Sequence, residues 1–308
     1  MDGSQKRVAI IPEVTRGTTP ADPAFLVLRN IRATGGKQQA RTRSPERLYT
    51  RASNSSYAGL VTIPYQIEAP LTYDVANHSL FASAFQGAWA TDVLKTSSTI
   101  AGMTLEEKYE GGATDFYRRC LGFFVESMSL VCRNGEPGML TFGGRGLTES
   151  TGSAILTNAT YVDPSPNGTP MTPASFVLND VFSLTTPKVQ GFTMNLRNNA
   201  YDLHGFGSDD PYDQGLGQLD IDGTVDLYFR TAAEYTGFVG AGMLGGVIDL
   251  TMGSVTTNKY RLKLPNCDIW APALADPGPS GPIVLTVNYM GHWKASDNAA
   301  AILTRAMA

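Results

Sequence analysis

Residues 103–144 read MTLEEKYEGGATDFYRRCLGFFVESMSLVCRNGEPGMLTFGG, and this stretch decides the fold. In its second half, side chains alternate between the two faces of a predicted strand. One face carries Phe124, Met128, Leu130 and Cys132, and the other carries Val125, Ser127, Ser129 and Val131. A repeat of two residues is typical of a half-buried β-strand. The strand is followed by Asn134 and Gly135, a pair that supplies the positive φ angles of a tight hairpin turn. The stretch therefore predicts an antiparallel hairpin.

Two further strand pairs and one helix are predicted outside this stretch. One pair joins residues 192–196 to 219–229, and the other joins 260–264 to 283–289. The helix covers about residues 74–89, with Asp74 as its N-cap and an apolar stripe at helical spacing: Leu80, Phe81, Ala84, Phe85, Ala88 and Trp89. The pattern predicts a mainly β fold, an antiparallel β-sandwich or barrel with one short α-helix, and not alternating βαβ units.

The order of several short pieces of the chain resembles the tail tube proteins of long-tailed bacteriophages. These pieces are the charged 105–109, the aromatic and basic 117–119 and the strand at 127–130, with 71–74 and the helix before them and 260–265 and 281–287 after them. The resemblance covers roughly residues 45–305. It implies subunits whose sheets join those of neighbours in a ring, commonly a hexamer, and rings that stack into a hollow tube. It also implies other tail proteins at the ends of the tube, and viral DNA that passes through without specific binding.

The chain of 308 residues carries its charges unevenly. Residues 1–55 hold ten Lys or Arg and four Asp or Glu, a net charge of +6, and the other 14 basic and 24 acidic residues give −10. We therefore predict a basic N-terminal arm at 1–55 and a single β-rich tube domain at 56–308. A nucleic-acid-binding tail is the alternative for such an arm. We expect the arm to dock on an acidic surface of a neighbouring copy through its basic residues: Arg29, Arg32, Lys37, Arg41, Arg43, Arg47 and Arg51.

Two long stretches, 148–175 and 198–217, interrupt the predicted strands. The first is rich in Thr, Ser, Pro, Gly and Asn, and the second contains Asp202, Asp209, Asp210 and Asp213. Long loops inside a compact domain are usually functional or flexible. In a tube-forming protein, these acidic residues are candidates for the channel wall or for contacts between stacked rings.

Two motifs point toward enzymes but disagree with the strand pattern around them. Residues 220–224 match the DxDGT signature of haloacid-dehalogenase-like phosphatases, in which the first aspartate is a nucleophile at the carboxyl end of a parallel strand. Here the alternation runs from Leu219 to Phe229, which predicts both Asp220 and Asp222 on a polar face in mid-strand. Residues 240–245 form a GxGxxG, but an alternating segment follows it, which predicts a turn between strands.

The remaining features suggest no active site. The three cysteines, Cys120, Cys132 and Cys267, lack CxxC spacing and are predicted to be small core side chains. No run approaches the roughly 18 apolar residues of a membrane span, and the N-terminus does not have the order of a signal peptide. We predict a soluble structural protein of the virion tail, made in the bacterial cytoplasm, with no catalytic, cofactor-binding or metal-ligating residue. The alternatives are a decoration or tail-terminator subunit, a carbohydrate-binding β-sandwich, and a Mg²⁺-dependent DxDGT phosphatase.

Overall fold

The computed structural model of the protein describes residues 5–46, 49–52, 55–111, 114–164, 169–182, 184, 187–230, 232–236, 238, 243–275 and 278–306. The strands are β1 (Lys6–Pro12), β2 (Ala24–Val27), β3 (Arg32–Gly35), β4 (Gln38–Arg43), β5 (Ser56–Thr62), β6 (Pro64–Pro70), β7 (Val93–Lys95), β8 (Met103–Tyr109), β9 (Phe116–Arg133), β10 (Met139–Arg145), β11 (Thr148–Gly152), β12 (Thr160–Val162), β13 (Val177–Val181), β14 (Val189–Arg197), β15 (Tyr201–Leu203), β16 (Asp213–Gly215), β17 (Asp220–Tyr228), β18 (Met243–Met252), β19 (Tyr260–Ala275), β20 (Val284–Gly291) and β21 (Ile302–Arg305). The helices are α1 (Val75–Ala84) and the short α2 (Ala232–Thr236), and short 3₁₀ turns cover Pro173–Ser175 and Gly278–Ser280.

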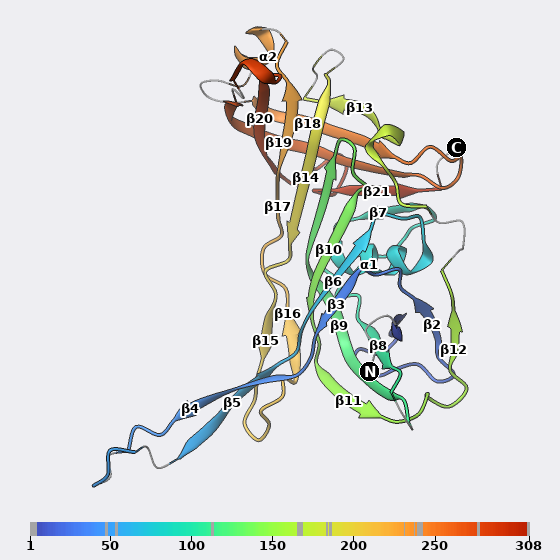
Figure 1. Ribbon diagram of the computed structural model, residues 1–308, viewed down its shortest axis with the longest axis vertical. Helices are drawn as coiled ribbons and strands as arrows, with labels where there is room; N and C mark the ends of the chain where they lie inside the picture. Colours follow the sequence, from blue (N-terminus) through green and yellow to red (C-terminus); the bar gives the residue numbers. More distant parts are fainter. Residues whose placement is uncertain are drawn as a thin grey trace.

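Two sheets share strand β9, as the course of that long strand in Figure 1 shows. The first sheet has the order β12-β2-β1-β8-β9-β11 and is antiparallel except for the β12 and β2 pair. The second has the order β3-β6-β10-β9-β14-β17-β20-β19-β18-β13, with β21 and β7 attached beside the first residues of β19. The predicted mainly β, antiparallel fold with one short α-helix is therefore confirmed.

The strand β9 changes sheets in its middle. Residues 116–121 pair with β8 and β11, whereas residues 124–133 pair with β10 and β14. Gly122 lies between the two halves with φ +65°, a conformation that favours glycine. The predicted alternation holds from Ser127 onward, but residues 122–125 are all buried because sheets cover both sides of the strand there.

The predicted hairpin of β9 and β10 is confirmed, but its turn is not the tight one expected. Leu140 pairs with Leu130, and the connecting loop runs from the end of β9 at Arg133 to Met139. Gly135 has a positive φ of 87°, whereas Asn134 does not share that conformation. A type I′ turn needs a positive φ at both central residues, so the longer loop replaces it.

Helix α1 begins where the sequence predicts and ends earlier. The Asp74 side chain accepts a hydrogen bond from the Ala76 N–H, and Phe85 is the C-cap. Gln86 then takes a positive φ of 51°, so residues 85–89 lie outside the helix. The helix buries side chains around most of its circumference, as expected for a helix inside a core and not on a surface.

The third predicted strand pair has a different register from the one expected. Strand β19 does pair with β20, but through residues 267–275, whereas residues 260–263 of β19 pair with β18 and β21. The second predicted pair, β14 with β17, is confirmed from Leu196 opposite Ile221 to Val189 opposite Leu227. The two stretches expected as loops contain short strands: β11 and β12 lie within 148–175, and β15 and β16 lie within 198–217.

One continuous apolar core joins both sheets to α1. It extends from Val8 on β1 to Leu303 on β21 and includes the large buried rings of Phe142, Tyr260 and Tyr289. Cys120, Cys132 and Cys267 are free and buried, which confirms their prediction as core side chains. Burial raises the pKa of the Cys132 and Cys267 thiols to about 12, so both are protonated and unreactive at neutral pH.

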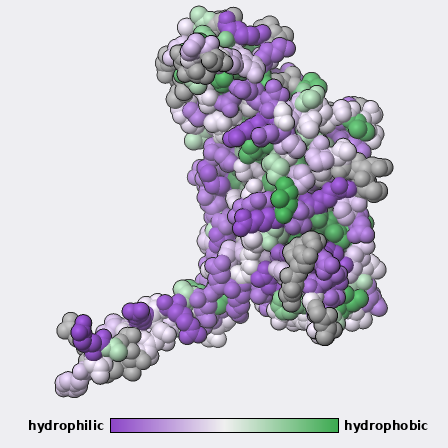
Figure 2. Space-filling model, viewed as in Figure 1, coloured by the Kyte–Doolittle hydropathy of each residue, from purple (hydrophilic) through white to green (hydrophobic). Residues whose placement is uncertain are grey.

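Residues 6–35, part of the segment predicted as an arm, lie in the sheets of the body. Strands β1 and β2 belong to the first sheet, and β3 belongs to the second. The projecting segment is instead the hairpin of β4 and β5, which Figures 1 and 2 show as a thin extension beside the body. We call residues 38–62 the arm from here on.

Candidate assembly surface

The arm is exposed to solvent along most of its length. All six residues of β4 are exposed, and Val61 is the one residue of β5 that is buried. The side chains of Arg41, Arg43 and Arg51 form no hydrogen bond or ion pair with any residue that the structure describes. A two-stranded hairpin without a covered face is marginally stable in water. The outer part of the arm is therefore a surface that a second protein would stabilise.

The base of the arm is held by the acidic stretch 198–217 of the same chain. The Val61 N–H donates to the carbonyl oxygen of Asp209 (2.9 Å), and the Gln39 side chain donates to the Asp209 carboxylate (2.9 Å). Lys37 Nζ lies 2.7 Å from an Asp210 carboxylate oxygen. Two of the predicted acidic residues and one of the predicted basic residues are thus brought together within one subunit.

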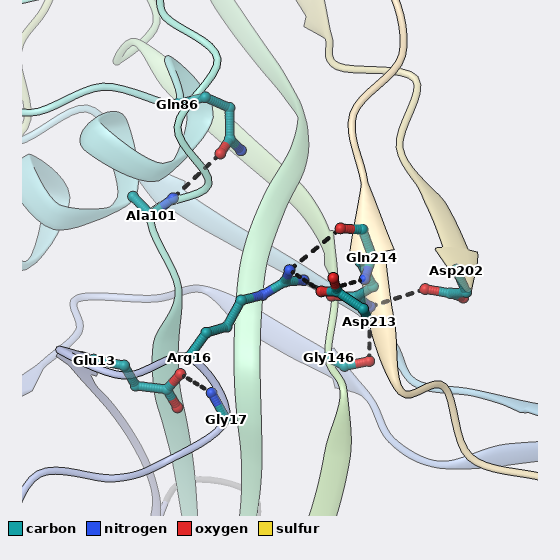
Figure 3. Close-up of polar contacts among 9 residues, drawn as sticks. All are labelled: Glu13, Arg16, Gly17, Gln86, Ala101, Gly146, Asp202, Asp213 and Gln214. Carbon is teal, nitrogen blue, oxygen red and sulfur yellow. Dashed lines mark hydrogen bonds and ion pairs between the residues drawn. The ribbon is translucent and has the colours of Figure 1, made fainter. Parts of the chain in front are cut away.

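The hairpin of β15 and β16 is anchored on the body by Arg16, which lies in the connection between β1 and β2 (Figure 3). The Arg16 guanidinium donates to the Asp213 carboxylate (2.9 Å) and to the side-chain oxygen of Gln214. Gln214 is buried, and its amide group donates to the Gly146 carbonyl (3.0 Å) and to Asp202 (2.9 Å). Burial lowers the pKa of Arg16, and the neighbouring carboxylates, Asp213 first, oppose this effect.

A second arginine completes the anchor from β10. Arg145 Nη1 lies 3.3 Å from Asp202, and its Nη2 donates to Glu126 (2.7 Å). The acidic side chains Asp202 and Asp213 therefore join the hairpin to the body. We call the set Arg16, Asp202, Asp213 and Gln214 the clamp. The sequence prediction missed Arg16 and Gln214, because no local pattern indicates that residue 16 meets residue 214.

The other predicted basic residues do not gather in one place. Arg29 lies beside Asp74 at the start of α1 (3.7 Å between Nε and the carboxylate), and Arg32 is exposed on β3. Arg47 lies outside the described residues. Only Arg41, Arg43 and Arg51 of the predicted set therefore lie on the described part of the arm.

A buried group of charges that sequence reasoning missed stabilises the first sheet. Glu107 is fully buried and lies 2.6 Å from Lys6 Nζ, and it accepts a hydrogen bond from Arg118 Nε (2.7 Å). Its neighbour Glu106 accepts hydrogen bonds from Arg119 Nε (2.7 Å) and from a tyrosine hydroxyl. The pairing of 105–109 with 116–120 places each glutamate opposite an arginine, so a register prediction for these two segments would have found the pairs.

The outward face of the second sheet is polar and hydrogen-bonded across its strands. Asn195 donates to Asp222 (3.3 Å), the Thr193 and Thr224 hydroxyls lie 2.8 Å apart, and Thr286 donates to Asp226 (2.7 Å). We call the outward face of β14, β17 and β20 the polar face. It carries short hydroxyl, amide and carboxylate side chains that hold one another in place, together with Arg197, which forms an ion pair with Asp222, and the exposed Met290.

The polar face includes the two aspartates and the threonine of the DxDGT motif, whereas Ile221 and Gly223 lie on the buried face of β17. Asp222 lies within β17 between the antiparallel strands β14 and β20, as predicted, whereas Asp220 is the first residue of β17 and pairs with β14 alone, so its predicted place in mid-strand was wrong. The phosphatase reaction needs the first aspartate at the carboxyl end of a parallel strand, an arrangement that β17 does not have. Of the GxGxxG, residues 240–242 lie outside the described residues, and the following segment is the strand β18, as predicted.

The described residues offer neither a metal site nor a membrane-spanning helix. In this part of the chain, no three or more His, Cys, Asp or Glu side chains form a group that would hold a metal ion. Within the same residues, the helices are too short to span a bilayer.

Fold and surface together define a class: a mainly β protein with a projecting arm, a polar sheet face and surfaces suited to contact with other chains. The sequence model of the phage tail tube protein family matches residues 3–291, nearly the whole chain. The chain therefore belongs to the phage tail tube protein family and is a structural protein of the phage tail. No curated protein matches it in a sequence search.

Proposed function

We propose that the protein assembles with copies of itself into rings of six subunits, and that the rings stack into a hollow tube through which viral DNA passes. The observation that carries this proposal is the arm: its strands β4 and β5 form a largely exposed hairpin. Its arginines Arg41, Arg43 and Arg51 have no hydrogen bond or ion pair with a described residue, and nothing in the described part of the subunit covers its outer part. A neighbouring copy would supply the missing cover. Other tail proteins bind the ends of the tube, and synthesis takes place in the cytoplasm of the bacterial host.

The polar face supports DNA passage better than the acidic stretch does. A channel rich in Lys and Arg would bind phosphate groups and release counterions, which would retard DNA. On the polar face, Asp226 adds a negative charge beside Thr286, whereas Asp222 forms an ion pair with Arg197 of β14, and short Thr and Asn side chains lie between them. Asp202, Asp209, Asp210 and Asp213 instead form contacts within the subunit. We therefore assign the channel wall to the polar face, and the four aspartates to holding the arm.

The first test is electron microscopy of the purified protein at high concentration. Tubes or stacked rings with a central channel are the expected result. Particles that stay monomeric at every concentration, even with tube-initiating tail proteins added, would contradict the proposal.

The role of the arm is tested by reversing three of its charges, Arg41→Glu, Arg43→Glu and Arg51→Glu. We expect a folded monomer that forms no tubes, because these side chains form no hydrogen bond or ion pair with the residues that the structure describes. The control reverses three exposed charges elsewhere, Lys95→Glu, Arg133→Glu and Lys188→Glu, and is expected to form tubes. Normal tubes from the arm variant would show that these arginines do not contribute to assembly.

A further inference from the structure

A groove lies beside the N-terminus of α1, on the part of the body formed by β2, β12 and the segments 169–175 and 253–258. Its volume is about 560 Å³, within the range of pockets that bind side chains or small ligands. Val75, Val162 and Val255 line it and are each more than half exposed. Apolar side chains that rim a concave site favour an occupant with apolar or aromatic groups.

The polar groups of the groove are incompletely paired. Two carboxylates line the groove: Asp74 lies beside Arg29 (3.7 Å between Nε and the carboxylate), whereas Asp163 makes no hydrogen bond or ion pair with any described residue. His78 is more than nine-tenths buried, and its Nε2 atom has no hydrogen-bond partner. Burial, and to a lesser extent the charge of Arg305, lowers the pKa of His78 to about 4, so the ring is neutral at physiological pH. The groove is therefore acidic and still able to form hydrogen bonds.

The arm has the complementary chemistry. Residues 38–62 contain four arginines and one glutamate. The ring of Tyr49 is fully exposed, and Tyr57 is more than half exposed. Arginine and tyrosine are residues that often supply the anchoring contacts of protein interfaces, because they combine large contact area with hydrogen-bonding groups. An aromatic and basic arm thus matches an apolar and acidic groove.

The placement of the two surfaces favours a contact between different copies. In Figure 1 the arm leaves the body on one side, and β2, β12 and α1 lie toward the other. The arm therefore points away from the groove of its own chain. Two complementary surfaces on different sides of one subunit produce a head-to-tail contact, which propagates around a ring or along a stack.

We propose that the groove lined by Val75, Asp163 and Val255 receives the arm of a second copy of this chain, with Tyr49 in the apolar part and the arm arginines beside Asp163. This inference rests on the proposed self-assembly and identifies the surface of the neighbouring copy that binds the arm.

Cysteine cross-linking tests the contact. The three natural cysteines are buried, so their thiols do not compete with the introduced ones. The double variant Tyr49→Cys with Val255→Cys is oxidised at high protein concentration and run on a non-reducing gel. We expect a ladder of covalent multimers, because each arm would join the next subunit. The matched control, Tyr49→Cys with Leu274→Cys, places the second thiol at an exposed site outside the groove and is expected to stay monomeric.

Electron microscopy of the same samples separates the two proposals. Tubes without a ladder would overturn the groove contact and leave the tube intact. A ladder without tubes would support the groove contact and contradict the tube, and the absence of both would contradict both.

A charge variant provides a second measurement that does not depend on cysteine geometry. Asp163→Lys is expected to raise the protein concentration needed for assembly about tenfold, since it places like charges together at the contact. Glu136→Lys makes the same charge change at an exposed turn and is expected to have no effect. Assembly of the Asp163→Lys variant at the unchanged concentration would overturn the proposal.

Discussion

The clamp predicts that one buried amide holds the arm in place. Replacing Gln214 by alanine removes three side-chain hydrogen bonds: those to Gly146, to Asp202 and from Arg16. The hairpin of β15 and β16 would then lose its central link to the body. Because Asp209, beyond β15, accepts the Val61 N–H, we expect the base of the arm to loosen as well.

The magnitude follows from the partners of the amide. One hydrogen bond to a neutral carbonyl contributes about 1 kcal/mol, and each of the two to charged groups contributes roughly 1.5–3 kcal/mol. Water can enter the vacated space and replace part of these bonds, because the side chain of Arg16 is partly exposed. We therefore expect Gln214→Ala to lower the free energy of unfolding by about 2–3 kcal/mol.

Urea unfolding and amide hydrogen exchange measure the two effects. The control is Gln39→Ala, which removes exposed hydrogen bonds at the other end of the same contact and is expected to cost about 0.5 kcal/mol. In the Gln214→Ala variant, amide hydrogen exchange should become faster in β15, in β16 and at the Val61 N–H. Equal stability of the two variants, with unchanged exchange at β16, would refute the assigned role of the clamp.

Three further variants test the core. His78 should make stability depend on pH: its pKa is about 4 when folded and 6.5 when unfolded, so stability is complete above pH 6.5 and falls by about 3 kcal/mol as the pH approaches 4. His78→Gln should remove this slope in urea titrations, and a slope that persists would contradict the assignment. Glu107→Gln should cost roughly 3–5 kcal/mol in the same assay, because it leaves buried cations uncompensated, whereas Glu110→Gln, in an exposed pair, should cost under about 1 kcal/mol. Gly223→Ala should abolish soluble folded protein, since an added Cβ would lie 2.0 Å from the Thr193 carbonyl oxygen; a normal circular dichroism spectrum would contradict the observed packing.

Much of the fold follows from periodicity. Alternating residues in 127–132, 192–196 and 219–229 are strands with the predicted inward faces, because a two-residue repeat identifies the side of a strand that is buried. Asp74 caps the helix as predicted, because capping depends on neighbouring residues only. The helix end was predicted too late, since its apolar stripe continues into residues that pack on the core without being helical.

The candidate site was predicted less completely. The sequence identified the basic and acidic segments, but it did not reveal that Lys37 pairs with Asp210 or that Arg16 reaches Gln214. Such contacts join residues far apart in the chain, and no local pattern encodes them. The unpaired state of Arg41, Arg43 and Asp163 was likewise hidden, because a charge count does not show which charges are already compensated.

Residue pattern alone predicted the strands of the hairpin at 127–144 and the pairing of β14 with β17, the start of the helix, the buried cysteines and the likeness to tail tube proteins. Each of these depends on residue type and on spacing along a single segment. The tertiary structure alone decided that β9 serves two sheets, that β19 divides its pairing between β18, β20 and β21, and that the arm projects from 38–62. These features depend on which distant segments can pack together at once, and that choice is made by the whole core.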